Sequence, residues 1–223
     1  MGSLITKIDA SAGAGLSARG GEVASRGNGA LRMRLGAAAM AFMTEHAQLA
    51  ARTYRAAADH YGLPSLSFWD RFGAETVTRL ALEPGMAVLD MCCGAGASAI
   101  TAARAVGTTG RVLGVDVAEP LLDQARARAA RAGLANIEFR HGEATCTGVP
   151  EGSFDAVTCV FGVFFAADIA AFAAEMWRLV RRRGALAVTT WGGLFEPANS
   201  HFSDAVGGGA AAGPGLQPEG PDH

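Results

Sequence analysis

Between Met86 and Trp191, segments with two different patterns of hydrophobic residues alternate along the chain. Short continuous apolar runs are typical of strands buried in a parallel sheet, and the segments between them repeat apolar residues every three or four positions, like one face of a helix. The predicted strands cover 87–91, 111–115, 136–140, 154–161 and 185–191, and the predicted helices cover 44–60, 67–80, 98–106, 121–132 and 169–180. This order predicts an α/β fold with a mainly parallel sheet and right-handed crossovers.

The two ends of the chain lack this pattern. Residues 1–42 are rich in Gly, Ala and Ser and show no lasting periodicity, and residues 207–223 contain a glycine-rich run with almost no β propensity. We therefore predict one domain over 43–206, between a disordered amino-terminal extension and a disordered tail. Met43 is a plausible true start of the domain.

The composition excludes several kinds of chemistry. The net charge of the 223 residues is −2, which argues against a general nucleic-acid binder. Lys7 is the single lysine, so the domain cannot hold a P-loop lysine, a Schiff-base lysine or a Tyr-x-x-x-Lys dehydrogenase pair. No apolar run approaches the ~20 residues of a membrane span, so we expect a cytoplasmic protein without one.

The four cysteines contain no Cys-x-x-Cys pair. Cys92, Cys93 and Cys159 lie in apolar, strand-like surroundings, and the fourth is Cys146. We expect small buried hydrophobic residues in a reducing cytosol, and neither a metal site nor a redox site.

One stretch carries most of the functional signal, Val-Leu-Asp-Met-Cys-Cys-Gly-Ala-Gly at 88–96. A buried strand ends near Asp90, and Gly94 and Gly96 let the backbone turn and let a ligand approach without meeting a Cβ atom. A carboxylate just before such a loop would repel a pyrophosphate but attract a cationic amino group. S-adenosylmethionine carries such an amino group, so the acid favours this cofactor over a dinucleotide.

Two further carboxylates follow the next predicted strands. Asp116 lies some twenty residues beyond the glycines and can accept both ribose hydroxyls, as in NAD enzymes. Glu143 is placed to accept a hydrogen bond from an adenine amino group, and the backbone of Ala144 can pair with the ring. With Asp90, these acids fall at the ends of three successive strands, which meet at one edge of a doubly wound sheet.

These motifs resemble the class I S-adenosylmethionine-dependent methyltransferases, in particular the ubiquinone/menaquinone-biosynthesis-like group. The resemblance covers about 54–206, and its other matching stretches are Gly114-Val115-Asp116, Gly142-Glu143-Ala144, Phe154-Asp155-Ala156-Val157, Leu179-Val180-Arg181 with Gly184, and Val188-Thr189-Thr190-Trp191. It implies a Rossmann-like three-layer sandwich that binds S-adenosylmethionine and methylates a small-molecule acceptor. The cofactor-binding residues that it implies are Asp90, Cys92, Gly94, Ala95, Gly96, Asp116, Val117, Glu143, Ala144 and Phe161.

The chain departs from the family pattern at four places, one of which is Glu143, where aspartate is commoner. Cys92 replaces the first glycine of the loop, which we expect to be tolerated through a negative φ. Arg182 and Arg183 stand where the family has a Pro-Gly turn, which should loosen that turn. The family also has a carboxyl-terminal β-hairpin, which the residues after Val206 do not resemble. We hypothesise a change of reading frame there and expect 185–191 to be an edge strand.

Several points stay open at this level. Gly94-x-Gly96-x-x-Ala99 also fits the dinucleotide pattern, so an NAD(P)-binding Rossmann oxidoreductase is the alternative enzyme. A truncated cofactor-binding module without transfer activity is the alternative to any enzyme. No catalytic residue is identified, because His141, the candidate base, is better explained as a structural or surface histidine. The oligomeric state is not readable, and Tyr54 and Trp69 are expected in the core or at the border of the ligand cleft.

Overall fold

The computed structural model describes residues 3–9, 44–61 and 67–191. The chain divides into two units, Leu4–Thr190 and a second that joins Met1–Ser3 to Trp191–His223. Nearly all described residues belong to the first unit. The predicted disordered tail at 207–223 and most of the predicted amino-terminal extension lie outside the described residues.

The first unit is built on a sheet with the strand order β1-β6-β5-β2-β3-β4. The strands are β1 (Ser3–Asp9), β2 (Ala87–Met91), β3 (Arg111–Asp116), β4 (Ile137–His141), β5 (Phe154–Val160) and β6 (Val180–Trp191). All the pairings from β4 through β3, β2 and β5 to β6 are parallel. The chain winds outward from β2 in both directions, so the topological switch point lies at the end of this strand.

Helices cover both faces of the sheet. They are α2 (Glu45–Ala57), α3 (Phe68–Leu80), α4 (Ala97–Val106), α5 (Glu119–Arg131) and α6 (Ile169–Leu179), with short 3-10 turns η1 (Ala58–His60) and η3 (Val163–Phe165). Helices α3, α4 and α5 share one apolar cluster with the sheet, and α6 packs in another on the opposite face. The predicted three-layer α/β sandwich is therefore confirmed.

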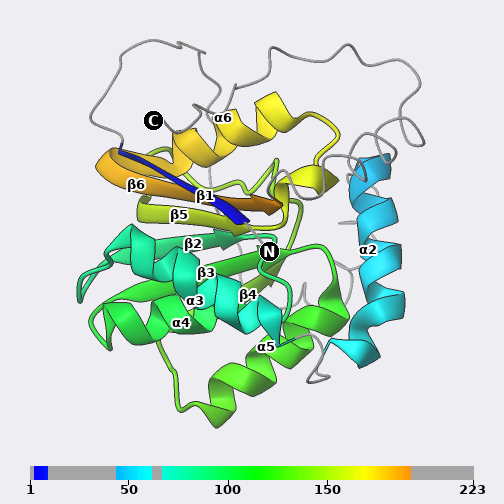
Figure 1. Ribbon diagram of the computed structural model, residues 1–223, viewed down its shortest axis with the longest axis horizontal. Helices are drawn as coiled ribbons and strands as arrows, with labels where there is room; N and C mark the ends of the chain where they lie inside the picture. The colour runs from blue at the N-terminus through cyan, green and yellow to red at the C-terminus, as the bar shows by residue number, and fades with distance from the viewer. Residues whose placement is uncertain (1–2, 10–43, 62–66, 192–223) are drawn as a thin grey trace, which may run out of the picture. The chain divides into compact units, whose positions relative to one another are not determined.

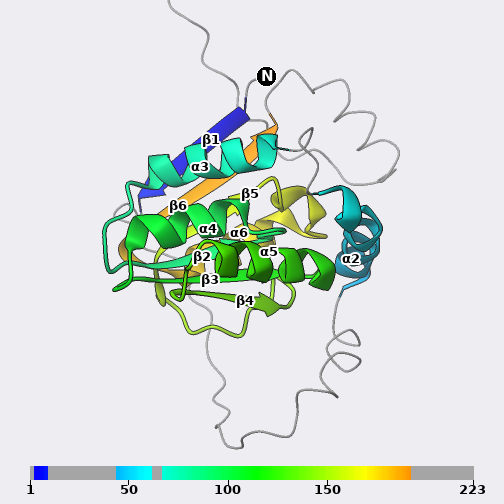
Figure 2. The ribbon, with the colours of Figure 1, turned by 90° about the horizontal axis from the view of Figure 1, so that it is seen from below.

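Helix α2 belongs to neither layer. In Figures 1 and 2 it stands beyond the carboxyl ends of the strands, at the edge where open α/β sheets bind ligands. Its Ala47 and Ala51 pack against Val117, and Tyr54 packs near Leu121 of α5. The helix thus covers the segment that follows β3, beside the switch point.

Local sequence explains where the helices begin and how closely they pack. The Thr44 hydroxyl caps α2 by accepting the Ala47 N–H at 3.2 Å, and Asp168 caps α6 in the same way. A Cβ atom on Gly73 would lie 2.8 Å from the backbone nitrogen of Ser98. Glycine at this position therefore lets α3 approach the first turn of α4.

The strand β1 corrects two expectations. Ser3–Asp9 forms an edge strand next to β6, so the prediction that 1–42 is disordered is wrong for these residues. The prediction that 185–191 lies at the sheet edge is wrong for the same reason. The segment Leu4-Ile5-Thr6-Lys7-Ile8 is rich in β-branched residues, and an unpaired strand edge is a ready template for such a segment.

The strand β6 also begins earlier than predicted. It starts at Val180, directly after α6, and its register with β5 shifts between the pairs Phe154–Val180 and Ala156–Ala185. Arg183 has a φ of 63°, the left-handed conformation that glycine normally supplies. The arginines thus form an irregular start of the strand where the family has a Pro-Gly turn. Within the described ranges, no helix combines the length and the apolarity that crossing a membrane requires.

Candidate functional site

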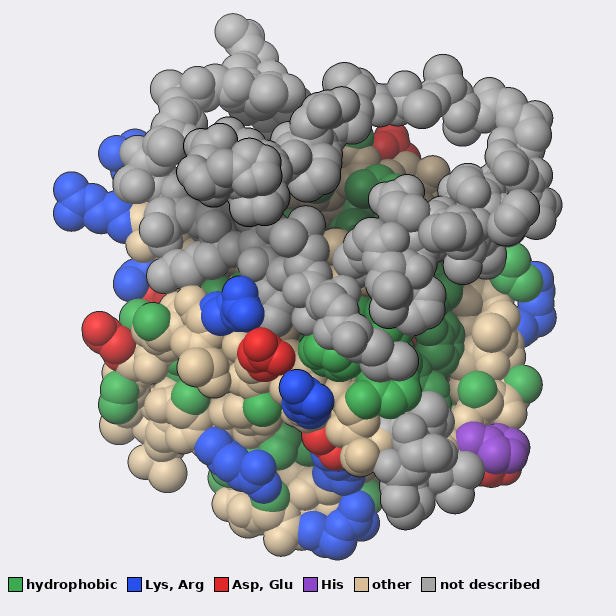
Figure 3. All heavy atoms as spheres, viewed as in Figure 1, with side chains coloured by type: hydrophobic (Ala, Val, Ile, Leu, Met, Phe, Trp, Pro, Cys, Tyr) green, Lys and Arg blue, Asp and Glu red, His purple; other side chains and the backbone are tan. Residues whose placement is uncertain are grey.

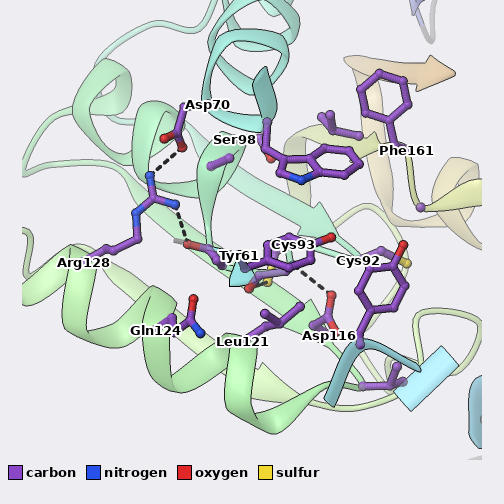
Figure 4. Close-up of a pocket in the computed structure, with 18 of the residues that line it drawn as sticks. Tyr61, Asp70, Cys92, Cys93, Ser98, Asp116, Leu121, Gln124, Arg128 and Phe161 are labelled. Carbon is purple, nitrogen blue, oxygen red and sulfur yellow. Dashed lines mark hydrogen bonds and ion pairs between the residues drawn. The ribbon is translucent and has the colours of Figure 1, made fainter. Parts of the chain in front are cut away.

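A cavity of about 360 Å³ opens at the carboxyl ends of β2, β3 and β5. Its walls come from the loop after β2, the segment after β3, the face of α5 that carries Leu121 and Gln124, and aromatic residues of α2, α3 and η3 (Figure 4). Predicted site residues that line it are Cys92, Gly94, Ala95, Asp116, Val117, Ala144 and Phe161. Segments far apart in the sequence thus meet at the switch point, as the strand order requires.

The loop over 92–96 is fastened to the end of β3. The Gly94 N–H donates to Asp116 Oδ2 at 2.8 Å, and the Cys93 N–H donates to the Val115 carbonyl at 3.1 Å. A Cβ atom on Gly96 would lie 3.2 Å from the Phe139 ring, and the φ of this glycine is 82°. The predicted glycine loop is therefore present, and it needs glycine both for its conformation and for space.

Asp116 stands at the junction of this loop and α5. Its Oδ2 accepts the Gly94 N–H, and its Oδ1 accepts the Ala118 N–H at 2.8 Å. Burial raises the pKa of the carboxyl, and these backbone hydrogen bonds oppose the rise. The carboxylate faces the cavity, so each oxygen retains a lone pair that can accept a hydrogen bond from a ligand hydroxyl.

Asp90 lies beneath the cavity and does not line it. Its side chain is fully buried, and Oδ2 accepts a 2.6 Å hydrogen bond from the Ser98 hydroxyl, which does line the cavity. Burial raises the pKa of Asp90 to about 7, although hydrogen bonds from Ser98 and the Ala99 N–H favour the charged form. Asp90 is therefore not part of the cavity wall, and its role toward a ligand ammonium stays a prediction. The carboxylate supports the first turn of α4 from below.

The Glu143 carboxylate accepts hydrogen bonds from Thr44, at the start of helix α2. Its Oε2 accepts the Thr44 N–H at 3.0 Å, and its Oε1 accepts the hydroxyls of Thr44 at 2.9 Å and Thr145 at 2.8 Å. The cavity walls include the neighbours Gly142 and Ala144 but not Glu143 itself. In this structure the acid anchors the start of α2, and its role toward adenine stays a prediction.

Two residues of the cavity wall have a strained backbone. Cys92 has a φ of 58° and Phe161 has a φ of 56°, both in the left-handed region. The expectation of a negative φ at Cys92 is wrong, because the residue adopts the conformation that the missing glycine would have taken. Such positions cost of order 1–3 kcal/mol each and tend to cluster at functional sites.

His141, the candidate base, does not line the cavity. Its Nε2 lies 3.0 Å from the Val117 carbonyl oxygen, at the end of β4. A structural role, the explanation favoured from the sequence, fits this contact. In the parts of the chain that the structure describes, no cluster of three or more His, Cys, Asp or Glu side chains could hold a metal ion.

Comparison with known proteins gives consistent results. Residues 88–184 match a family model described as a methyltransferase domain. The nocamycin O-methyltransferase of Saccharothrix syringae is 40% identical over 107 residues, which are 48% of this chain and 38% of that protein. The demethylmenaquinone methyltransferase of Lactococcus lactis is 33% identical over 115 residues, 52% of this chain and 46% of that protein. The chain thus spans less than half the length of these two curated relatives.

A solved structure agrees with this assignment. The S-adenosylmethionine-dependent methyltransferase of Aquifex aeolicus superposes with a TM-score of 0.54 and 26% identity, over 61% of this chain and 72% of that one. Over these residues the chain is similar to S-adenosylmethionine-dependent methyltransferases. The resemblance drawn from the motifs, including that to the menaquinone-biosynthesis-like group, is confirmed.

The cavity fits S-adenosylmethionine. A ligand in the cavity would meet no Cβ atom at Gly94, and Asp116 offers an acceptor to the hydroxyls of a ribose. Apolar and aromatic side chains make up much of the rest of the wall, as suits an adenine ring or a sulfonium group.

The aromatic wall of the cavity was only partly predicted. Tyr54 meets Phe165 edge to face at 5.1 Å between ring centroids, Tyr61 stacks on Trp69 at 5.9 Å, and Trp69 meets Phe161 at 5.4 Å. Tyr54 and Trp69, which were expected in the core or at the border of the ligand cleft, line the cavity. Tyr61 and Phe165 were missed, because their contacts join segments distant in the sequence.

The two tyrosines of this wall are poor acids. Burial is the main cause that raises the pKa of Tyr54 to about 12 and the pKa of Tyr61 further. Both phenols are therefore neutral at physiological pH. They can donate hydrogen bonds to a ligand, but they do not supply a base.

Arg128 is a further residue that the sequence did not reveal. It lies on α5, and its guanidinium donates to the Ala95 carbonyl at 3.1 Å and pairs with Asp70 of α3 at 2.5 Å (Figure 4). Both contacts border the cavity. The arginine therefore links the glycine loop to α3 and α5.

Proposed function

We propose that this chain binds S-adenosylmethionine in the cavity and transfers its methyl group to a small-molecule acceptor. The observation that carries the proposal is the glycine loop held by Asp116 at the topological switch point, with Asp116 and the loop both facing the cavity. We extend the methyltransferase domain to 43–206, because α2 and its cap at Thr44 complete one side of the cavity. The cofactor supplies a methyl group already activated at a sulfonium centre.

The protein's part in this reaction is to bind, align and exclude water. Among the described residues that line the cavity there is no histidine or lysine, and both tyrosines are neutral. Asp70 pairs with Arg128, and Asp116 accepts two backbone N–H groups. We therefore propose an acceptor that is nucleophilic by itself near neutral pH, such as an ionised enol or phenol, which needs no base from the protein.

The surface also favours a small acceptor over a nucleic acid. Arginine side chains and acidic side chains are interspersed on the face shown in Figure 3, and the net charge is −2. A nucleic-acid binder would gather positive charge on one face. We also propose a cytoplasmic location, since the four cysteines are free thiols.

Calorimetric titration with S-adenosylmethionine, its demethylated product and NADH tests the cofactor. We expect the first two to bind, and we expect Asp116→Asn to weaken their binding by ~1–3 kcal/mol through lost hydrogen bonds to a charged acceptor. Asp123→Asn, at an exposed acid of the following helix α5, is the matched control and should bind normally. Binding of NADH alone would favour the oxidoreductase alternative. Cofactor binding without methylation of any acceptor in a broad screen would favour a binding module.

A further inference from the structure

Two cysteines from different strands meet at the wall of the cavity. Cys92 follows β2, and Cys159 lies in the neighbouring strand β5. A Cβ atom placed on Gly162 would lie 2.8 Å from Cys159 Sγ and 2.9 Å from Cys92 Sγ, and it would also touch Cys92 Cβ. Both sulfurs therefore pack against the same point, and only a glycine at 162 leaves room for them.

The two thiols also interact directly. A hydrogen bond with Cys159 is the largest cause that raises the pKa of Cys92 well above its usual value, and burial is the second. The other two cysteines lie elsewhere. Cys93 Sγ packs near Gly114 and Phe139, and Cys146 is exposed.

The pair is reachable from one side only. Cys92 is partly exposed and lines the cavity, whereas Cys159 is fully buried behind it. A small oxidant that enters the cavity would therefore meet Cys92 first, with Cys159 placed to complete a bond. This arrangement separates an attacking thiol from a resolving thiol.

We propose that Cys92 and Cys159 form a reversible disulfide that closes the cofactor site, with hydrogen peroxide as the oxidant. The Cys92 thiolate attacks one peroxide oxygen, the O–O bond breaks, and the product is a sulfenic acid and one water. The Cys159 sulfur then attacks the sulfenic sulfur, and a second water leaves. Together the two thiols lose two protons and two electrons, and the peroxide is reduced to two waters.

The raised pKa sets the speed of this reaction. Only the thiolate attacks peroxide, so oxidation is slow near neutral pH and becomes faster as the pH rises. The pair is therefore expected to respond to sustained oxidation rather than to brief exposure. This inference revises the expectation that the cysteines serve only as small buried hydrophobic residues.

Closure of the disulfide should distort the glycine loop. A disulfide needs its sulfurs about 2.05 Å apart, much closer than hydrogen-bonded thiols, so Cys92 must move toward β5. Cys92 lies two residues before Gly94, whose N–H is fastened to Asp116. We expect the cofactor to bind at least tenfold more weakly after oxidation, and this part of the inference rests on the proposed function.

The experiment compares reduced and peroxide-treated full-length protein. Peptide mass mapping should show the Cys92–Cys159 cross-link, with two hydrogens lost, and calorimetry should show the loss of affinity for S-adenosylmethionine. Addition of a thiol reductant should reverse both changes. Cys146→Ser should behave as the wild type, whereas Cys159→Ser should bind the cofactor and keep at least most of its affinity under peroxide. Cys159→Ala serves if the serine variant melts far below the wild type.

Three results would overturn the proposal. Sulfur oxidation at Cys92 without a cross-link to Cys159 would show that the proposed disulfide does not form. An equal loss of affinity in Cys159→Ser would assign the effect to another residue. A cross-link that leaves the affinity for S-adenosylmethionine unchanged would show that the disulfide does not regulate the cofactor site. If reduced wild type fails to bind the cofactor, the proposed function fails, and the mass mapping still decides whether the two thiols form a bond.

Discussion

The replacement of Asp90 by asparagine tests how the buried acid contributes to stability. Asparagine keeps the shape of the side chain and can still accept hydrogen bonds from the Ser98 hydroxyl and the Ala99 N–H. Its amide group would replace Oδ1, which has no hydrogen-bond partner among the described residues. Thr158 lies opposite on β5, and its Oγ1 also lacks such a partner. The variant removes a buried charge and gives these atoms a chance to pair.

The magnitude follows from the raised pKa of Asp90. Its pKa rises from 3.8 to about 7 in the folded protein. Between about pH 4 and pH 7 the folded protein therefore holds a proton that the unfolded chain has released, so stability falls as the pH rises through this window and then levels off. At 1.36 kcal/mol per pKa unit, the ionised acid costs up to about 4 kcal/mol above pH 7. The neutral amide of the Asp90→Asn variant would avoid this cost.

Urea denaturation between pH 4 and pH 8 measures the effect. We expect Asp90→Asn to be more stable than the wild type by about 2–4 kcal/mol at pH 8, or roughly 10 °C in melting temperature, and about equally stable near pH 4. The exposed Asp123→Asn should follow the wild-type curve. A variant that is less stable at pH 8, or whose curve runs parallel to that of the wild type, would refute the argument.

Two further predictions concern the packing of α3 against α4 and the capping of α2. Gly73→Ala should destabilise the protein by ~1–3 kcal/mol, because its Cβ would lie 2.8 Å from the backbone nitrogen of Ser98, which cannot turn aside; a melting temperature equal to the wild type's would contradict this. Thr44→Val removes the cap of α2 and one hydrogen bond to Glu143, so we expect a loss of ~1–2 kcal/mol and faster hydrogen exchange in α2, with the amides of β2 unchanged.

Local signals in the sequence were sufficient to predict most of the fold. The strands β2, β3 and β5 each fill a buried layer and therefore read as continuous apolar runs, which set their positions closely. The glycine loop and Asp116 were predicted because a turn with positive φ and a charged strand end are local properties of the chain. The family resemblance then implied a Rossmann-like three-layer sandwich, which the structure confirms.

The missed features depend on contacts between distant segments. The burial of Asp90 beneath the cavity was not predicted, because a strand end does not determine whether a carboxylate points above or below the loop that follows. The sheet position of β1 depends on which edge is open, and the contacts of Arg128 depend on how closely α5 approaches the loop. Glu143 follows a strand end, as predicted, yet its hydrogen-bond partner Thr44 lies 99 residues earlier in the sequence. No periodicity or motif signals such pairs.

The pKa of Asp90 also links cofactor binding to protons. S-adenosylmethionine would bring a sulfonium and an ammonium into the cavity above Asp90, and Ser98 connects the acid to the cavity wall. Nearby positive charge favours the ionised carboxylate, so binding should lower the pKa of Asp90 and release a proton at pH values below about 7. We therefore expect affinity to rise as the pH increases from 6 to 8. Calorimetry at pH 6.5 in buffers with different ionisation enthalpies should detect the released proton. It should be absent in Asp90→Asn, whereas an equal proton release in that variant would assign the proton to another group.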